Sequence, residues 1–285
     1  MSYANFIPTV WNEEINRELD RLCVFVEDCN TKYEGNVSSK GESVKILGVG
    51  KPTIKSVAKK DKNNDIDAAE EIEDASIIMQ IDQIRYFNYK VGDIDKAQAV
   101  GGVMEALQLE TTEGLANEVD KYIADLAKDD QAKKLYNTVP KVVEGIAGSG
   151  EINVLKALRD AKKALFKNDV SPSTKIVVTV DADFADLFVA AYTDKNTNNS
   201  ENLKNGRIGM YNSLTIKASN NVASDINGTS FIMARTQRAI AYAKPLTHTE
   251  PYRPEKSFSD AVKGFILFGA KIVRPKELVV INVKY

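Results

Sequence analysis

Histidine and cysteine are nearly missing from this chain, which has one histidine and two cysteines among its 285 residues. A single histidine excludes a multi-histidine zinc or iron site, and two cysteines are too few for a four-thiolate cage. Long apolar runs are missing too, because aliphatic stretches such as 278–281 are far too short to span a bilayer. The sequence therefore favours neither a common metal centre nor a membrane-spanning helix.

An excess of charge of either sign is also lacking. The chain carries 38 Lys+Arg and 40 Asp+Glu, a formal net charge of -2, which argues against a protein held to nucleic acid mainly by a basic face. With 43% hydrophobic and 27% charged residues, the composition is that of a soluble globular protein. The length suggests one or two domains.

The N-terminal part of the chain is expected to be helical. The first eight residues have neither the basic nor the apolar segment of a signal peptide, so we expect folding in a cytoplasm. A helix over 10–29 is predicted by one apolar stripe, formed by Trp11, Ile15, Leu19, Leu22 and Val26. Cys23 and Cys29 would lie on this helix about 9 Å apart along its axis, too far for a disulfide, and are expected as buried free thiols.

Residues 32–91 have the pattern of a long two-stranded hairpin with a charged tip. A strand-like stretch at 43–47 is followed by glycines, and alternating apolar residues over 77–91 predict one long returning strand. Between the two strands lie a lysine group and then an acidic group: Lys51, Lys55, Lys59, Lys60 and Lys62, followed by Asp65, Asp67, Glu70, Glu71, Glu73 and Asp74.

The length of this hairpin has a physical consequence. An arm of about 20 residues reaches up to roughly 65 Å at about 3.3 Å per residue. A compact domain of this size has a radius of gyration of only about 19 Å. The hairpin must therefore either wrap its own domain or project from it, and a projecting hairpin needs a neighbouring molecule because isolated two-stranded hairpins are marginal in water.

The remaining elements alternate between helices and strands. Helices are expected over 94–128, with a buried stripe from Leu107 to Leu126, over 152–167, and over 183–192. The inward residues of the second helix are expected to be Val154, Leu155, Leu158, Ala161, Leu165 and Phe166. Residues 193–206 predict an exposed Asn-rich loop. Strands are expected at 175–180, 214–218, 230–234, 239–243, 264–268 and 271–285.

No group of residues suggests catalysis. His248 lies in a polar connector, 245–249, without an assignable nucleophile, and is expected to be a surface histidine. The carboxylates of 65–74 lack the spacing and the central glycine of an EF-hand loop. We therefore expect no enzyme, no cofactor and no metal. The last 51 residues carry ten Lys+Arg and four Asp+Glu, a basic bias that suits packaged nucleic acid, an acidic neighbour or ordinary surface equally well.

The order of these elements resembles the HK97-type major capsid proteins of tailed bacteriophages. Residues 33–46 resemble the beginning of the family's extended loop, and 81–99 resemble its exit into the spine helix. The sequence Glu118-Val119-Asp120-Lys121-Tyr122-Ile123 is similar to the spine helix itself. Further similarity lies at 205–209 to the axial-domain strands, and at 257–264 and 269–275 to the closing segment. The number and order of these matches carry the resemblance.

The resemblance implies an α+β, HK97-type capsid fold in five parts. These are an N-terminal arm (1–31), an extended loop (32–91), a peripheral domain with the spine helix (92–139), an axial α/β domain (140–245) and a C-terminal return through the peripheral domain (246–285). The extended loop would lie over an adjacent subunit. The lysine and acidic groups near its tip, from Lys51 to Asp74, would then form complementary intersubunit contacts.

The function implied by the resemblance is self-assembly, as hexamers and pentamers, into an icosahedral shell that encloses phage double-stranded DNA. Scaffold and portal proteins would be further partners, the packaged DNA would be held by non-specific contact, and no membrane would be involved. The protein would be assembled in the host cytoplasm and reside in the virion capsid.

Two other hypotheses remain open from the sequence. One is a cellular shell protein of the same fold, an encapsulin-like nanocompartment that encloses cargo. The other is a soluble enzyme or small-ligand-binding protein with its site within 175–235. The three hypotheses differ in the particle that they predict: a DNA-filled virion, an empty or protein-filled shell, or a monomer or small oligomer with a concave pocket.

Overall fold

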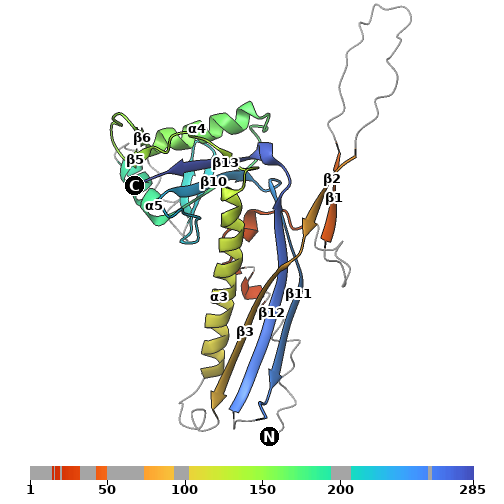
Figure 1. Ribbon diagram of the computed structural model, residues 1–285. Helices are drawn as coiled ribbons and strands as arrows, with labels where there is room; N and C mark the ends of the chain where they lie inside the picture. The colour runs from red at the N-terminus through yellow and green to blue at the C-terminus, as the bar shows by residue number, and fades with distance from the viewer. Residues whose placement is uncertain are drawn as a thin grey trace, which may run out of the picture.

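The computed structural model describes residues 15–32 except 16 and 20, 43–49, 74–92, 103–193, 207–255 and 259–285. Within these ranges the chain divides into an upper region around a six-stranded sheet and a lower region around a three-stranded sheet and a long helix (Figure 1). A two-stranded hairpin stands beside them. Helices and sheets are mixed in this way in an α+β fold, as the sequence predicts.

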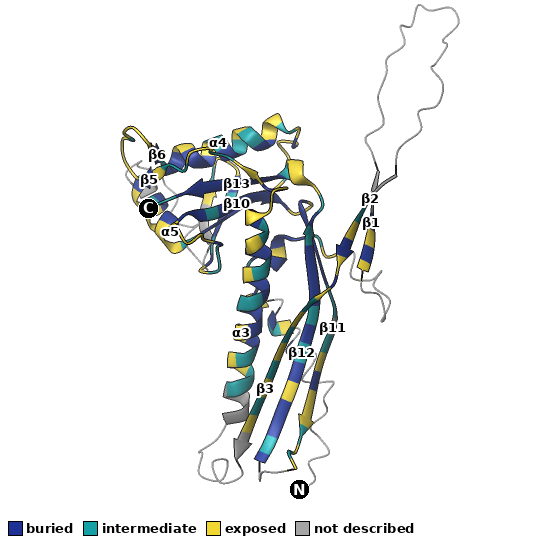
Figure 2. Cartoon of the chain, in the orientation of Figure 1, coloured by how far each residue is buried: buried dark blue, intermediate teal, exposed yellow. Residues whose placement is uncertain are grey.

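The six-stranded sheet of the upper region has the order β4-β13-β10-β7-β9-β8. Its strands are β4 (Lys133–Lys134), β7 (Ile176–Val180), β8 (Arg207–Tyr211), β9 (Leu214–Ala218), β10 (Ser230–Thr236) and β13 (Leu278–Val283). Every residue of β7 and β13 is buried (Figure 2). Strands buried on both faces read as continuous apolar runs, which is why the sequence predicted β7 so directly.

Two helices, α4 (Val154–Lys167) and α5 (Ala182–Thr193), pack together against this sheet. Asn153 caps α4, because its side-chain oxygen accepts a hydrogen bond from the Leu155 N–H at 2.9 Å. The predicted inward residues of α4 are all buried except Phe166, which is 37% exposed, so that part of the prediction is wrong. Beside α4, β5 (Lys141–Val143) and β6 (Glu151–Asn153) form a small parallel pair.

The lower region consists of α3 (Val103–Asp125) packed along the sheet β11-β12-β3. The strands are β3 (Gln83–Gly92), β11 (Ile240–Tyr252) and β12 (Ser259–Ile272). From α3, Leu115, Val119 and Ile123 meet Ile266 and Phe268 of β12 in one core. The helix continues into a short 3-10 turn, η4 (Leu126–Lys128), close to the predicted end at 128.

The hairpin consists of β1 (Ser43–Val49) and β2 (Asp74–Gln80), with Ser43 opposite Gln80 and Val49 opposite Asp74. The single strand predicted over 77–91 is wrong, because it is divided at 81–82 into β2 and β3. The two strands have different partners: β2 pairs with β1, and β3 pairs with β12. Buried and exposed residues nevertheless alternate through both strands, so the predicted alternation over 77–91 is correct. What the sequence did not predict is that the two strands pair with different partners.

The N-terminal helix is shorter than predicted. Helical residues end at Leu22, and Val26–Asp28 form a separate 3-10 turn, η2. The reason is a long-range contact: Asp120 of α3 accepts hydrogen bonds from the N–H groups of Val24 and Phe25. Cys23 and Cys29 are therefore not on one helix, although both are buried and free, as expected.

Two further corrections concern strands near the C-terminus. Residues 245–249, predicted as a polar connector, belong to β11, and the register of β11 against β12 shifts between Ala243 and Leu246. The two strands predicted at 264–268 and 271–285 are instead the long β12, a 3-10 turn η5 (Pro275–Glu277) and β13. Cross-strand pairing with β12 stabilises polar β11 residues that local composition assigns to a loop.

Some expectations fall on residues that the structure does not describe. The Asn-rich loop was predicted over 193–206; Thr193 is the last residue of α5, and 194–206 lie outside the described residues, as do 50–73 and 93–102. The five domain boundaries stay predictions. Among the described helices, none is long and apolar enough to cross a membrane. The described residues also contain no cluster of three or more His, Cys, Asp or Glu side chains arranged to hold a metal.

Candidate assembly interface

The root of the β1–β2 hairpin is fixed to the upper part of the three-stranded sheet. Val44 and Ile46 of β1 and Met79 of β2 are buried in a small core with Ala241 and Ala243 of β11. Only one face of the hairpin root is therefore shielded from solvent. Ile78, on the opposite face of β2, is 53% exposed.

A glycine allows the hairpin to approach β12 this closely. A Cβ atom added at Gly269 would lie only 2.3 Å from the carbonyl oxygen of Gln80, closer than real Cβ contacts. Lys271, two residues further along β12, donates a hydrogen bond to the Ile78 carbonyl at 2.9 Å. The hairpin therefore leaves the sheet in a direction set by backbone contacts as well as by apolar packing.

Below the hairpin root, one face of the three-stranded sheet is covered by α3, and the other is not covered by any helix or sheet among the described residues. Directly paired residues of antiparallel strands point to the same face, so the register identifies the members of this outer face. They are Ile84, Tyr86 and Asn88 of β3, Lys263, Phe265 and Leu267 of β12, and His248, Glu250 and Tyr252 of β11. Ile84 is 56% exposed and Tyr86 is 78% exposed.

The outer face is apolar at one end and polar at the other. Ile84 lies opposite Leu267, and Tyr86 lies opposite Phe265. Toward the other end, Lys263 forms an ion pair with Glu250 at 3.2 Å, and the Tyr252 hydroxyl donates to Asn88 at 3.0 Å. His248 is exposed beside Phe265, which confirms the surface histidine expected from the sequence.

Sequence reasoning missed the apolar members of this face. In the strand predicted over 77–91, the polar residues Gln80, Asp82, Asn88 and Lys90 indicate the exposed side, and the prediction did not consider Ile84 and Tyr86, which lie on that same side. The sequence did contain a signal for this face, because apolar residues occur on both faces of the predicted strand. They are typical of a strand that is covered on both faces, one of them by something other than its own chain.

Buried charges join the upper and lower regions through residues 23–30. The guanidinium of Arg235 in β10 is fully buried, donates to the Phe25 carbonyl at 2.8 Å and lies over the Phe25 ring. Lys217 of β9 binds Asp28, and Asn30 pairs with Ala241 of β11. The segment therefore contacts both sheets and α3.

The carboxylate of Asp120 is the unusual group in this joint. Burial raises the pKa of Asp120 to about 6, because desolvation outweighs the hydrogen bonds from Val24 and Phe25 and the charge of Arg235. In the same joint, burial also raises the pKa of the Cys29 thiol. Both groups are buried where residues 23–30 contact α3 and the two sheets, so we interpret the cluster as a structural joint.

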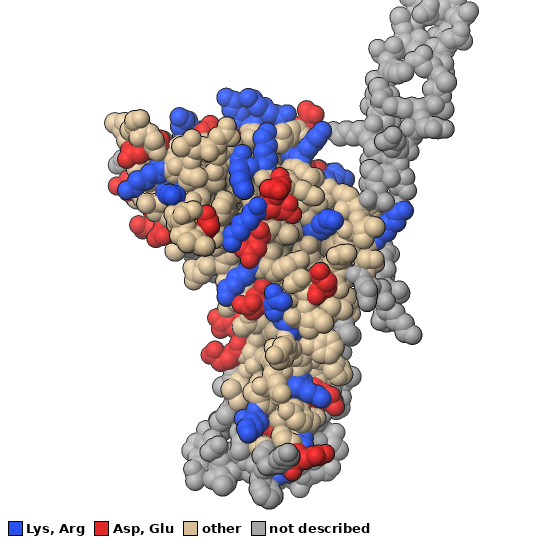
Figure 3. All heavy atoms as spheres, viewed as in Figure 1, with Lys and Arg blue, Asp and Glu red and all other residues tan. Residues whose placement is uncertain are grey.

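The residues predicted as intersubunit contacts are mostly not described. Lys51, Lys55, Lys59, Lys60, Lys62, Asp65, Asp67, Glu70, Glu71 and Glu73 lie outside the described residues. Asp74 is the first residue of β2, opposite Val49, where the hairpin strands begin to pair. In the described surface, Figure 3 shows mixed charges along the molecule and a gathering of Lys and Arg over α4 at the top.

The comparison with known proteins rests on structure, since no protein-family model and no curated protein matches the sequence. A solved structure from Mycobacterium phage Che8 is 29% identical, with a TM-score of 0.70 over 91% of this chain and 90% of that one. The capsid structure of the cyanophage P-SCSP1u is 14% identical, with a TM-score of 0.69 over 92% and 88%. A virus-like particle from Pyrococcus furiosus is 11% identical, with a TM-score of 0.58 over 96% and 98%.

These likenesses cover nearly the whole chain in both directions and show that it has the HK97-type fold. They confirm the resemblance drawn from the sequence. The cyanophage structure is that of a capsid and the Pyrococcus structure is that of a virus-like particle, to which the likeness is weaker. The neighbours are structural proteins of assembled shells rather than enzymes.

Proposed function

We propose that this chain is a phage major capsid protein that assembles, as hexamers and pentamers, into an icosahedral shell around double-stranded DNA. The observation that carries the proposal is the fold match to phage capsids over about nine tenths of both chains. The protein would act in the virion capsid after assembly in the host cytoplasm, with scaffold and portal proteins as additional partners. It would need no cofactor and would catalyse no reaction.

The exposed outer face supports self-association. Two large apolar side chains, Ile84 and Tyr86, lie in line with Leu267 and Phe265 on a sheet face that α3 does not cover. Adjacent exposed apolar groups of this kind mark interaction sites. Repeated around a shell, one such contact of modest affinity suffices, because each subunit is held by several neighbours at once.

We also propose that the lysine and acidic groups between β1 and β2 contact neighbouring subunits. The support is their opposite charge and their place in the chain, between two paired strands whose root is fixed to β12. Charge pairs at such a contact would select the register of assembly more than they would add affinity.

Reversing the charge of the lysine group tests this contact. The triple variant Lys59→Glu, Lys60→Glu, Lys62→Glu should fold normally and lose most of its particle yield in light scattering and electron microscopy. A variant that keeps the charge, Lys59→Arg, Lys60→Arg, Lys62→Arg, is the control and should assemble. Normal particle yield in the glutamate variant would remove the proposed role of this group.

The second candidate is a cellular nanocompartment of the same fold, favoured by the likeness to the virus-like particle from Pyrococcus furiosus. Expression of the chain alone and with candidate scaffold proteins, followed by electron microscopy and light scattering, tests shell formation itself. We expect closed particles. A chain that stays monomeric under every condition would contradict both shell proposals, and particles found in cells filled with protein rather than DNA would favour the nanocompartment.

A further inference from the structure

The helix α4 carries an unusual concentration of positive charge. Its 14 residues include five cations and one carboxylate, Asp160, whereas the whole chain has nearly equal numbers of each. The buried residues Leu155, Leu158 and Leu165 fix one face of the helix to the upper core. The cations occupy the remaining surface: Lys156, Arg159, Lys162, Lys163 and Lys167.

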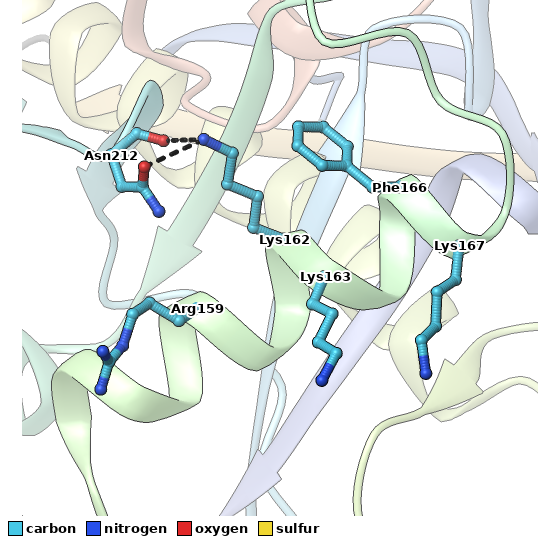
Figure 4. Close-up of a pocket in the computed structure, with 6 residues that line it drawn as sticks. All are labelled: Arg159, Lys162, Lys163, Phe166, Lys167 and Asn212. Atoms are coloured by element: carbon cyan, nitrogen blue, oxygen red, sulfur yellow. Dashed lines mark hydrogen bonds between the residues drawn. The ribbon is translucent and has the colours of Figure 1, made fainter.

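Five of the six residues that line an open hollow of about 580 Å³ come from α4, and the sixth is Asn212. Figure 4 shows Lys162 reaching toward Asn212, whose side-chain oxygen accepts a hydrogen bond from it at 3.1 Å. Asn212 has a φ of 50°, in the turn between β8 and β9. Lys163 and Lys167, one helical turn apart, extend side by side, and the exposed ring of Phe166 lies beside the Lys162 ammonium.

Most of these cations have no carboxylate partner in the part of the chain that the structure describes. No ion pair involves Lys156, Arg159, Lys163 or Lys167 there. By contrast, Lys121 and Lys128, in and just beyond α3, pair with Glu118 and Asp125 at 3.1 and 2.7 Å. The positive charge over α4 is therefore uncompensated locally, while that along α3 is balanced.

The arrangement opposes the stability of the helix itself. Arg159, Lys163 and Lys167 are spaced at i and i+4, where like charges destabilise a helix by a few tenths of a kcal/mol per pair. The helix dipole favours cations at Lys163 and Lys167 near the C-terminal end, but it disfavours Lys156 in the first turn. Helix stability therefore does not explain why α4 carries all five cations. An anionic partner that binds them would explain it.

The shape of the surface indicates which anion. The hollow is open, and the cations of α4, four of which line the hollow, span about 16 Å along the helix axis from Lys156 to Lys167. A small phosphate compound requires convergent, enclosed polar groups, whereas an extended polyanion requires a row of separated cations. DNA carries closely spaced phosphate charges along its whole length, so a row of cations of this length can face several phosphates at once.

The residue types also favour nucleic acid over a protein partner. Four of the five cations are lysines, a residue depleted in protein–protein interfaces, and protein–DNA interfaces are much more positively charged. We propose that the exposed face of α4 is the surface through which each subunit contacts the phosphate backbone of the packaged double-stranded DNA. This inference rests on the proposed capsid function and assigns α4 to the inner wall of the shell.

Removing the unpaired cations tests the assignment. The α4 variant is Lys156→Gln, Arg159→Gln, Lys163→Gln, Lys167→Gln; Lys162 is kept because Asn212 holds it. The control variant removes the same number of charges elsewhere: Lys121→Gln, Lys128→Gln, Lys133→Gln, Lys134→Gln. Full-length subunits are titrated before assembly with a fluorescent 30-bp duplex of random sequence at 50 and 200 mM NaCl, and folding is checked by circular dichroism.

Wild-type subunits should bind the duplex about 100-fold more weakly at the higher salt, as expected for about four neutralised phosphates. The α4 variant should bind at least 10-fold more weakly than the wild type at 50 mM NaCl, while the control variant should bind like the wild type. Equal losses in both variants, or no loss in the α4 variant, would overturn the assignment. So would preferential binding of a peptide with the acidic sequence of 63–75 in place of DNA.

Particle formation separates this inference from the capsid proposal. The α4 variant should assemble as efficiently as the wild type, because its substitutions leave the outer face and the hairpin unchanged. If wild-type subunits form no particles, the capsid proposal fails whatever the DNA titration shows. If both variants form particles and bind DNA equally, only the assignment of α4 fails.

Discussion

In the upper region every residue of β7 and β13 is buried, whereas in the lower region Ile84 and Tyr86 of β3 are 56% and 78% exposed. The upper sheet is covered on both faces by its own chain. The lower sheet is covered on one face by α3, and its outer face and the exposed side of the hairpin have no cover of their own among the described residues. The described residues of the upper half therefore complete their own core, whereas those of the lower half leave an apolar face exposed, which under the proposed function a neighbouring subunit would cover.

The first prediction tests the complete half and has the largest effect on stability. Leu158 of α4 is fully buried against the upper sheet, so Leu158→Ala should lower the free energy of unfolding by about 2–5 kcal/mol. Urea denaturation of dispersed subunits measures this loss. The matched control, Val189→Ala on the exposed side of α5, should cost less than about 0.5 kcal/mol. A loss below about 1 kcal/mol for Leu158→Ala would contradict a tightly packed upper core.

The second prediction concerns the joint between the halves and its pH dependence. The pKa of Asp120 is raised from 3.8 to about 6, so between these values the folded subunit binds more protons than the unfolded chain. The contribution of Asp120 to stability is therefore fully present below about pH 4 and is lost as the pH rises through 6. At about 1.4 kcal/mol per pKa unit, the loss is about 3 kcal/mol.

The difference in unfolding free energy between the wild type and Asp120→Asn isolates this group, because other titrating residues cancel. Measured by urea denaturation from pH 4 to 7, the wild type should lose about 2.4 kcal/mol relative to the variant, because part of the full effect lies outside this pH range. A difference that does not change with pH would show that Asp120 is not the buried, proton-binding group of the joint.

The third prediction concerns the hairpin root. Gly269→Ala places a methyl group against the Gln80 carbonyl and should destabilise the subunit by about 1–3 kcal/mol and redirect the hairpin. Gly114→Ala is its control: nothing lies within 4 Å of the added atom, and alanine should stabilise α3 by about 0.5–1 kcal/mol. Thermal unfolding measures both changes. If both substitutions changed the stability in the same direction, the close approach of Gln80 to Gly269 would be contradicted.

The fourth prediction has the smallest effect on stability. On β3, Ile84→Asp with Tyr86→Asp should change the unfolding free energy of dispersed subunits by less than about 1 kcal/mol, because both side chains are already in solvent. The same variant should form at least tenfold fewer particles. Phe87→Asp, one position along the strand and packed toward α3, should instead unfold the lower region. A stable double variant with normal particle yield would show that the outer face takes no part in assembly.

Local patterns predicted the upper region well. The continuous apolar run of β7 and the three- and four-residue spacing of α4 depend on nearby residues alone, and both elements lie where the sequence placed them. Phe166 was assigned to the core because its spacing fits, but it faces the hollow of α4. Periodicity identifies a helix more reliably than it identifies the edge of the buried face.

Contacts between distant residues limited the prediction elsewhere. The N-terminal helix ends at Leu22 because of Asp120, which is 96 residues away from Val24 in sequence, and no local signal marks that end. The division at 81–82 depends on the change of partner from β1 to β12, which sequence alternation cannot reveal. The charged hairpin contacts lie mostly outside the described residues and stay a proposal. The outer face was missed because the polar residues on the same side of the strand indicated an ordinary solvent-exposed face.

The dependence of the lower region on neighbours is tested most directly by an electron cryomicroscopy reconstruction of the assembled particles. We expect closed icosahedral shells in which a neighbouring subunit covers Ile84, Tyr86 and Phe265 on the outer face of every subunit. A reconstruction in which this face remains open to solvent in all subunits, or particles that are no larger than a small oligomer, would contradict it.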